Sequence, residues 1–363
     1  MLTSGIIFKN FKIKKNSFSV QKKLVSLLKS KNEVVNSLSQ NYKNSFTKKY
    51  LQKYKKKINY RIIGMGGSTL GTQAIYDFLK NKIKKNFVFI DNLQANTNKN
   101  KKKYTNLIVS KSGSTIETIV NTNILIKKKD KNIFITENKN SYLLSLAQKL
   151  KSDIIHHNNY IGGRFSVLSE VGMLPAELMG LKASNFRQLN NLIKNKRFIN
   201  SLISNVGSTL YFIKKKKFNS VIINYDERSK NLFNWYQQLI AESLGKKKKG
   251  ILPIVASMPK DNHSTMQLYL DGFKKNFFTF FYVHEKNSEK LDYNNILASQ
   301  YYLKNKDLSQ ITLAQKKATE NVFKKKNIPF RSFEINQRNE KTLGELFCFF
   351  ILETILIGQS MNL

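Results

Sequence analysis

The sequence is short of arginine and of acidic residues relative to lysine. Only seven of its 63 basic residues are arginine, so 56 are lysine, while aspartate and glutamate total 23 and the formal net charge is +40. Specific recognition of nucleic acid relies on the bidentate arginine fork, so this scarcity disfavours a nucleic-acid-binding function, which would rest on charge alone. The lysines stand in runs among many asparagines, a pattern typical of solvated surface encoded by an AT-rich genome. We expect the charge at most to attract anionic substrates.

Cysteine is nearly absent, and no hydrophobic run is long enough to cross a bilayer. Cys348 is the only cysteine, so an internal disulfide is impossible, and its phenylalanine neighbours predict a buried thiol in a core helix rather than a nucleophile. The longest apolar run, residues 346–356, is interrupted by Glu353. The first residues lack the apolar segment of a secretory signal. We therefore expect a cytoplasmic protein with no membrane partner.

What the sequence does contain is a repeated alternation of short apolar runs and helical patterns. This alternation predicts an α/β fold of two domains, each a mainly parallel sheet flanked by helices, after an N-terminal helical extension. The expected limits are 1–56 for the extension, 57–190 for the first domain and 191–363 for the second. Strands are expected at 60–63, 87–90, 107–109, 133–136, 154–155, 220–224, 251–255, 277–284 and 331–335, and helices at 70–79, 116–126, 142–150, 232–244, 264–270, 308–324 and 342–357.

Two junctions between a predicted strand and a predicted helix are rich in glycine and hydroxyl side chains. They read GMGGSTLG at 64–71 and SKSGSTIET at 110–118. Such a junction presents unpaired backbone N–H groups at the positive end of a helix dipole, where hydroxyl groups add hydrogen-bond donors. Ordinary helix capping explains one hydroxyl per helix, but not the three serines and one threonine of the second loop. We predict that these loops bind a small phosphorylated ligand.

Neither loop fits the common nucleotide-binding patterns. The P-loop pattern G-x-x-x-x-G-K-[ST] is absent from the sequence. A dinucleotide fingerprint beginning at Gly64 and Gly66 would need a third glycine at position 69, where Thr69 stands. Asp91 lies at a tolerable distance for a ribose-binding acid, so dinucleotide binding is kept as a weaker alternative.

Three later stretches concentrate residue types that carry chemistry: GGRFSVLSEVGMLP (162–175), WYQQLIAESLGKKKKG (235–250) and MPKDNHSTMQLYLDG (258–272). Gln238 and Glu242 are four residues apart on a predicted helix and therefore share a face. A carboxylate beside an amide can act as a general base next to a group that positions the substrate. The alternative is an ordinary surface glutamate.

Five motifs taken together resemble the glucose-6-phosphate isomerase family. They are IGMGGSTLG, SKSGSTIET, GGRFSVLSEVG, QQLIAESLGK and PKDNHSTMQLYLDG, and they follow the family's order over about residues 59–357. The resemblance implies two sugar-isomerase (SIS) domains and the reversible conversion of glucose 6-phosphate to fructose 6-phosphate, through a cis-enediolate, in glycolysis and gluconeogenesis. Such a reaction needs a base and an anion stabiliser but neither a cofactor nor a metal. Consistently, the sequence has no His/Cys cluster with metal-ligand spacing.

The resemblance also implies roles for individual residues. Arg164 would stabilise the enediolate, and Glu242 would move the proton between C2 and C1. His263 would open the sugar ring, and it would enter the site from the neighbouring subunit of a homodimer. The implied substrate-binding residues are Gly67, Ser68, Ser110, Lys111, Ser112, Thr115 and Gln238.

One departure from the family concerns its last motif, of the form Asn-Pro-aromatic-Asp-Gln-x-x-Val-Glu-x-x-Lys. This sequence ends at Leu363, where that motif would begin, so we expect a truncated chain that binds sugar phosphates but turns over the cyclic substrate poorly. Two other functions stay open: a non-catalytic SIS protein that binds a sugar phosphate, and an isomerase that also acts on mannose 6-phosphate. An isomerase of phosphorylated amino sugars would not explain GGRFS together with AESLGK.

Overall fold

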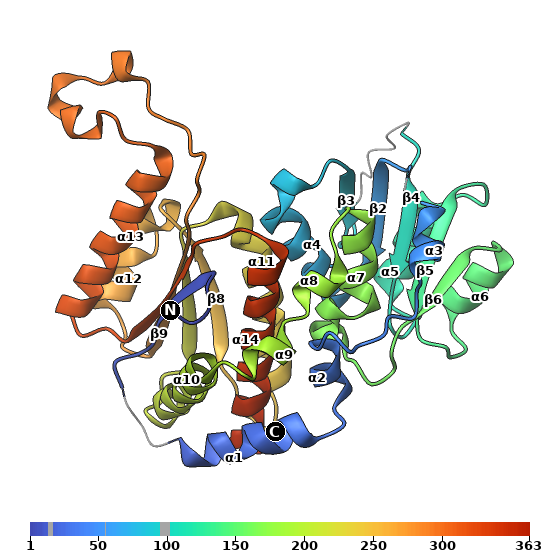
Figure 1. The fold of residues 1–363 in the computed structure, drawn as a ribbon, viewed down its shortest axis with the longest axis horizontal. Coiled ribbons are helices and arrows are strands. Elements are labelled where there is room, and N and C mark those ends of the chain that lie inside the picture. Colours follow the sequence, from blue (N-terminus) through green and yellow to red (C-terminus); the bar gives the residue numbers. More distant parts are fainter. Residues whose placement is uncertain (14–16, 55, 95–101) are drawn as a thin grey trace.

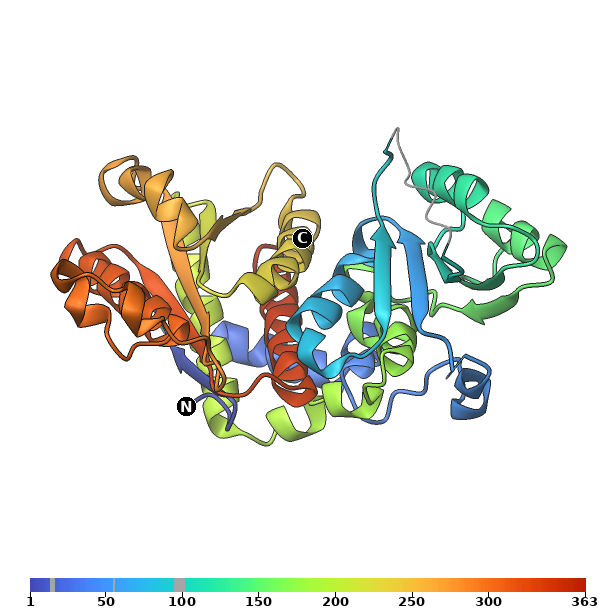
Figure 2. The ribbon, with the colours of Figure 1, turned by 90° about the horizontal axis from the view of Figure 1, so that it is seen from above.

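Two five-stranded sheets, each flanked by helices, make up the protein (Figures 1 and 2). The computed structural model describes residues 1–13, 17–54, 56–94 and 102–363. We call the first sheet with its helices the first unit, and the second sheet with its helices the second unit. The predicted α/β architecture of two mainly parallel sheets is confirmed.

The first sheet is entirely parallel, in the order β3-β2-β4-β5-β6. After β2 the chain builds β3 on one side and then β4 on the other, so the strand order reverses between β2 and β4. Ligands of parallel sheets bind at such switch points, outside the carboxyl ends of the strands. The elements are β2 (Asn59–Gly64), β3 (Asn86–Ile90), β4 (Thr105–Val109), β5 (Lys131–Thr136), β6 (Asp153–His156), α4 (Leu70–Phe78), α5 (Ile116–Leu125), α6 (Tyr142–Lys149) and α7 (Glu170–Leu178).

The second sheet has the order β1-β10-β9-β7-β8, in which β1 alone is antiparallel. Its switch point lies between β7 and β9, because β8 is added on one side of β7 and β9 on the other. The elements are β1 (Ile6–Lys9), β7 (Asn219–Asn224), β8 (Leu252–Ser257), β9 (Asn276–Val283), β10 (Phe330–Ile335), α10 (Lys196–Lys214), α11 (Lys230–Leu244), α12 (Met266–Asp271), α13 (Leu308–Lys325) and α14 (Glu340–Ser360).

The N-terminal segment is not purely helical, which corrects the expectation for residues 1–56. Ile6 of β1 pairs with Ile335 of β10, so the beginning of the chain completes the second sheet. A four-residue strand is too short to show an alternating pattern, and its partner lies near the other end of the chain. We keep 57–190 and 191–363 as a proposal for the two domains.

The remaining elements are α1 (Phe18–Lys29), α2 (Glu33–Ser37), α3 (Lys48–Gln52), α8 (Ala183–Phe186), α9 (Leu189–Leu192) and the 3₁₀ turns η1 (Gly66–Ser68), η2 (Lys80–Lys82), η3 (Gly163–Leu168), η4 (Glu227–Ser229), η5 (Lys260–His263), η6 (Tyr293–Asn295) and η7 (Ala298–Leu303).

Three helices join the two units: α4 packs on α11, and α11 packs on α14. Among the described residues, α14 is the one helix long and apolar enough to cross a membrane, but 89% of its most apolar stretch is buried inside the protein, as expected for a core helix. Cys348 of α14 is fully buried, and this burial raises the pKa of its thiol to about 12. The predicted buried thiol is confirmed. Glu353, which interrupts the apolar run, pairs with the buried Arg331 of β10.

Candidate active site

Two glycine turns meet beside the carboxyl end of β2. A Cβ atom on Gly67 of η1 would lie 2.2 Å from the carbonyl carbon of Gly163 in η3, so only glycine permits this contact. Gly66 adopts a φ of +52°, and a Cβ there would lie 2.8 Å from Nε2 of Gln238. These close approaches hold η1 with Ser68, η3 with Arg164, and α11 together. The motifs GMGGS, GGRFS and QQLIAES are therefore one site in space.

Arg164 and Gln238 hold the Glu242 carboxylate from two sides. Nη1 of Arg164 donates to Oε1 of Glu242 at 2.7 Å, and Nε2 of Gln238 donates to Oε2 at 3.2 Å. Arg164 is itself positioned by Ser243, whose hydroxyl accepts from Nε at 2.7 Å, and by Trp235, whose Nε1 donates to the Arg164 carbonyl at 3.2 Å. The Glu242 side chain is 51% exposed, whereas Arg164 is 18% exposed. A half-exposed carboxylate fixed beside a guanidinium can take a proton from a bound substrate while the cation stabilises the anion that forms.

The SKSGST loop follows β4 directly and lies next to the η1 turn, because Gly64 at the end of β2 pairs with Val109 at the end of β4. The buried Ser110 hydroxyl lies 3.0 Å from the Thr115 hydroxyl. Thr115 is the N-cap of α5, yet its side chain makes no capping hydrogen bond. By contrast, the N-cap of α6, Ser141, accepts a hydrogen bond from the backbone N–H of Leu144. Ordinary capping therefore does not explain these hydroxyls, and the first N–H groups of α5 are open to an anion.

The other predicted phosphate ligands differ in their surroundings. Ser112 is exposed, and its hydroxyl accepts from the backbone N–H of Ser114 at 3.3 Å. Lys111 turns toward the β5 and β6 side of the loop, where its Nζ donates to the Asn159 carbonyl at 2.8 Å and pairs with Glu137 at 3.2 Å. Phosphate binding by these residues stays a prediction, and Lys111 would have to exchange a partner to reach the ligand.

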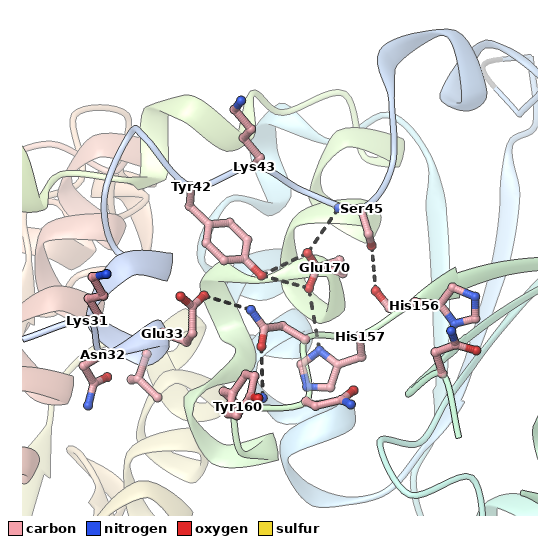
Figure 3. A pocket seen from close by; sticks show the side chains of 14 residues that line it. Lys31, Asn32, Glu33, Tyr42, Lys43, Ser45, His156, His157, Tyr160 and Glu170 are labelled. Atoms are coloured by element: carbon pink, nitrogen blue, oxygen red, sulfur yellow. Dashed lines mark hydrogen bonds and ion pairs between the residues drawn. The ribbon is translucent and has the colours of Figure 1, made fainter. Parts of the chain in front are cut away.

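A cavity of about 840 Å³ lies at the carboxyl end of β6 (Figure 3). One of its lining residues, Asn159, accepts the hydrogen bond from Lys111. At its inner wall the buried carboxylate of Glu170 accepts hydrogen bonds from the Tyr42 hydroxyl at 3.0 Å and from the Ser45 N–H at 3.2 Å, and it lies 3.6 Å from Nδ1 of His157. Burial alone would raise the pKa of Glu170, but His157, the backbone of α7 and Tyr42 together hold it below its usual value. Sequence reasoning missed this cluster, although the adjacent residues His156 and His157 and an acidic residue in the first turn of α7 were local signals.

His263 stands on a different turn from the residues that surround Glu242. It ends η5, beyond the carboxyl end of β8, and it is exposed. Within the described residues it forms no hydrogen bond or ion pair with Glu242, Arg164 or Gln238. The prediction that it completes the site of a second subunit stays a prediction.

Two remaining points concern Asp91 and the binding of a metal ion. Asp91, the possible ribose-binding acid, accepts a hydrogen bond from Nε2 of Gln73 at 2.7 Å. The part of the chain that the structure describes contains no group of three or more His, Cys, Asp or Glu side chains placed to hold a metal ion.

Comparison with solved structures gives the class of protein to which this fold belongs. A protein of Thermus thermophilus described as hypothetical matches with a TM-score of 0.81 and 20% identity, covering 95% of this chain and 89% of that one. A glucose-6-phosphate isomerase of Chlamydia trachomatis matches with a TM-score of 0.67 and 18% identity, covering 98% of this chain and 77% of that one. The chain therefore has the SIS-type fold, with two sheet domains, that these structures share.

Sequence comparison gives the family. The sequence model of the phosphoglucose isomerase family matches residues 22–346. The glucose-6-phosphate isomerase of Methanocaldococcus jannaschii is 33% identical over an alignment of 336 residues, and the match covers 86% of this chain and 82% of the relative. The glucose-6-phosphate isomerase of Mycoplasmopsis pulmonis is 32% identical over an alignment of 336 residues, and the match covers 83% of this chain and 77% of the relative. The chain belongs to the phosphoglucose isomerase family.

Proposed function

We propose that this chain is a glucose-6-phosphate isomerase that interconverts glucose 6-phosphate and fructose 6-phosphate in the cytoplasm, as a step of glycolysis and gluconeogenesis. The observation that carries the proposal is the cluster of Glu242, Arg164 and Gln238 beside an uncapped, hydroxyl-rich helix start. The relatives' names, glucose-6-phosphate isomerase in both cases, support the same substrate.

In this proposal the phosphate of the sugar lies on the N-terminus of α5, where Ser110, Lys111, Ser112 and Thr115 surround it. Backbone N–H groups and hydroxyls can bind a phosphate dianion without arginine. The sugar then extends from the β4 loop toward the β2 loop, past Gly67 and Ser68. Because these two loops stand on neighbouring strands, the carbon end of the substrate reaches the side of the site where α11 approaches η1.

The chemical step assigns one role to each charged residue. Glu242 takes the proton from C2 of the open-chain aldose and returns it to C1, while the proton of the C2 hydroxyl passes to O1. The base is thereby regenerated, and the carbon skeleton is unchanged. Negative charge develops on the oxygen atoms of the enediolate, and the Arg164 guanidinium, already directed at Glu242, stabilises it. Gln238 keeps the carboxylate oriented. An exposed His263 suits donation to a neighbouring subunit, where it would open the ring, and we therefore propose a homodimer.

An assay of fructose 6-phosphate formation from glucose 6-phosphate tests this function. Glu242→Gln should lower turnover by roughly 10²–10⁴-fold, as expected for loss of a positioned base, while sugar-phosphate binding persists. Glu227→Gln, at an exposed residue of η4, is the matched control and should leave turnover unchanged. If the parent chain binds fructose 6-phosphate but shows no turnover, the protein is a sugar-phosphate-binding module. If Glu242→Gln turns over as fast as the parent, the enzyme uses another base.

A further inference from the structure

The second sheet has a switch point of its own, and a cavity lies there. The carboxyl ends of β7 and β9 lead to Asp226 and to His284, and a cavity of about 670 Å³ is lined by residues 284–289 and 336–339 together with Arg228. Its remaining lining comes from Leu308 and from Leu79, Asn81 and Lys82 of the first unit, so the cavity spans both units. This is the position in the second sheet that corresponds to the proposed substrate site in the first.

Two of the seven arginines converge on this cavity. Nε of Arg338 donates to Oε1 of Glu285 at 2.7 Å, and Nη1 of Arg228 lies 3.8 Å from the same oxygen. Nη1 of Arg228 is buried and has no hydrogen-bond partner among the described residues. In a chain that uses lysine for nearly every other cation, paired arginines mark a place where the planar fork matters, as it does for phosphate.

Glu285 occupies the place that an anionic ligand would take. Its carboxylate lies between the two guanidinium groups and is 33% exposed, whereas Arg338 is 8% exposed and is fixed from behind by Asp226 at 2.7 Å. A carboxylate at the mouth of a cavity can swing out, but a buried arginine held by a second acid cannot. The volume exceeds what a bare phosphate needs and suits a small organic ligand, whose hydroxyls the amides of Asn336 and Gln337 can meet.

We propose that this cavity is a second phosphate-binding site, for a small phosphorylated metabolite, in which Arg228 and Arg338 hold the phosphate and Glu285 is the internal counter-ion that it displaces. A ligand bound there touches both units, so it would bind more tightly to the arrangement of units seen here than to any other. The site does not depend on the catalytic roles proposed above, because it shares no residue with them.

The test compares hydrogen-exchange protection of residues 284–289 and 336–339 while inorganic phosphate or fructose 6-phosphate is added to the full chain. Glu285→Gln removes the competing charge and should tighten binding by about 10-fold, whereas Arg228→Lys, which keeps the charge but loses the fork, should weaken it by about 10-fold. Arg197→Gln, at an exposed arginine of α10, is the control and should change nothing. Stronger protection with fructose 6-phosphate than with phosphate would identify an organic ligand, and equal protection would identify the phosphate group alone.

A purely structural role for the ion pairs of Glu285 predicts a change in stability rather than in affinity. Glu285→Gln would then lower the thermal stability and gain no affinity, because the variant has lost the ion pairs with Arg228 and Arg338. The proposal is overturned if millimolar phosphate and fructose 6-phosphate protect neither segment in the parent or in Glu285→Gln. It is also overturned if Arg228→Lys binds both probes as tightly as the parent.

Discussion

At the scale of single residues, Glu170 shows how a buried carboxylate keeps its charge. It is 2% exposed, it accepts hydrogen bonds from Tyr42 and Ser45, and Nδ1 of His157 lies 3.6 Å from it. Arg187 is stacked on the Tyr42 ring at 4.8 Å and donates to the Tyr42 carbonyl at 3.1 Å, which holds the N-terminal segment against the first unit. The ionised form of Glu170 is therefore built into the folded state.

Glu170→Gln tests this assignment through the pH dependence of stability. Because the folded state lowers the pKa of Glu170 below its usual value of 4.5, the stabilisation is present above that value and is lost as the pH falls through the folded pKa. At pH 7 the variant should unfold more easily by about 1–3 kcal/mol. Between neutral pH and strongly acidic pH the parent should lose more stability than the variant, as measured by urea unfolding. Parallel pH profiles would show that the Glu170 charge does not contribute.

Residue identity could be predicted where a motif carries it, but residue contacts could not. The type and helical spacing of Gln238 and Glu242 can be read locally, and the structure confirms that they share a face. The pairing of Glu242 with Arg164 joins positions far apart in the chain, so spacing alone does not contain it. The same holds for Glu170 and Tyr42, whose contact depends on how the N-terminal segment crosses the first unit.

At the scale of elements, the start of α5 carries most of the proposed substrate affinity. Its N-cap hydroxyl is not used for capping, so Ser112→Ala and Thr115→Ala should weaken binding of fructose 6-phosphate, each by roughly 10–150-fold, since a hydrogen bond to a charged group contributes about 1.5–3 kcal/mol. The stability of the chain should change little. Calorimetric titration measures both variants.

The matched control is a hydroxyl that does cap its helix. Thr47 accepts a hydrogen bond from the Tyr50 N–H at the start of α3, so Thr47→Ala should cost about 1 kcal/mol of stability and leave fructose 6-phosphate affinity unchanged. If all three variants lose stability and none loses affinity, the hydroxyls of the SKSGST loop have a structural role only.

Elements with a clear apolar period could be predicted to within a few residues, and elements without one could not. α10 was missed because glycine, serine and asparagine, which are weak helix formers, interrupt it. Its buried residues Phe198, Leu202, Val206 and Phe212 nevertheless follow helical spacing. β1 was missed for a different reason, since its strand conformation depends on pairing with β10.

At the scale of the whole molecule, each of the two units contributes part of the proposed active site. The first unit contributes the phosphate loop, η1 and η3, and the second contributes α11 across the contact between α4 and α11. His263 stands on an exposed turn beyond β8. A single chain therefore brings together the proposed base and anion stabiliser, and we propose that the ring-opening histidine comes from a second subunit.

Complementation between two inactive variants tests whether His263 acts across a subunit interface. Glu242→Gln keeps a native His263, and His263→Ala keeps a native Glu242, so each homodimer should be impaired on the cyclic substrate. If the histidine comes from the neighbouring subunit, a mixed dimer contains one site with both native residues and one site with neither. Co-expression in equal amounts should then restore about one quarter of the parental activity, because half of the dimers are mixed and half of their sites are intact.

If His263 acts within its own chain, every site in the mixture lacks one residue, and the mixture should be no more active than the average of the two variants. Size-exclusion chromatography supplies the control, since both variants must form dimers for the comparison to apply, and a monomeric parent would contradict the proposed assembly directly.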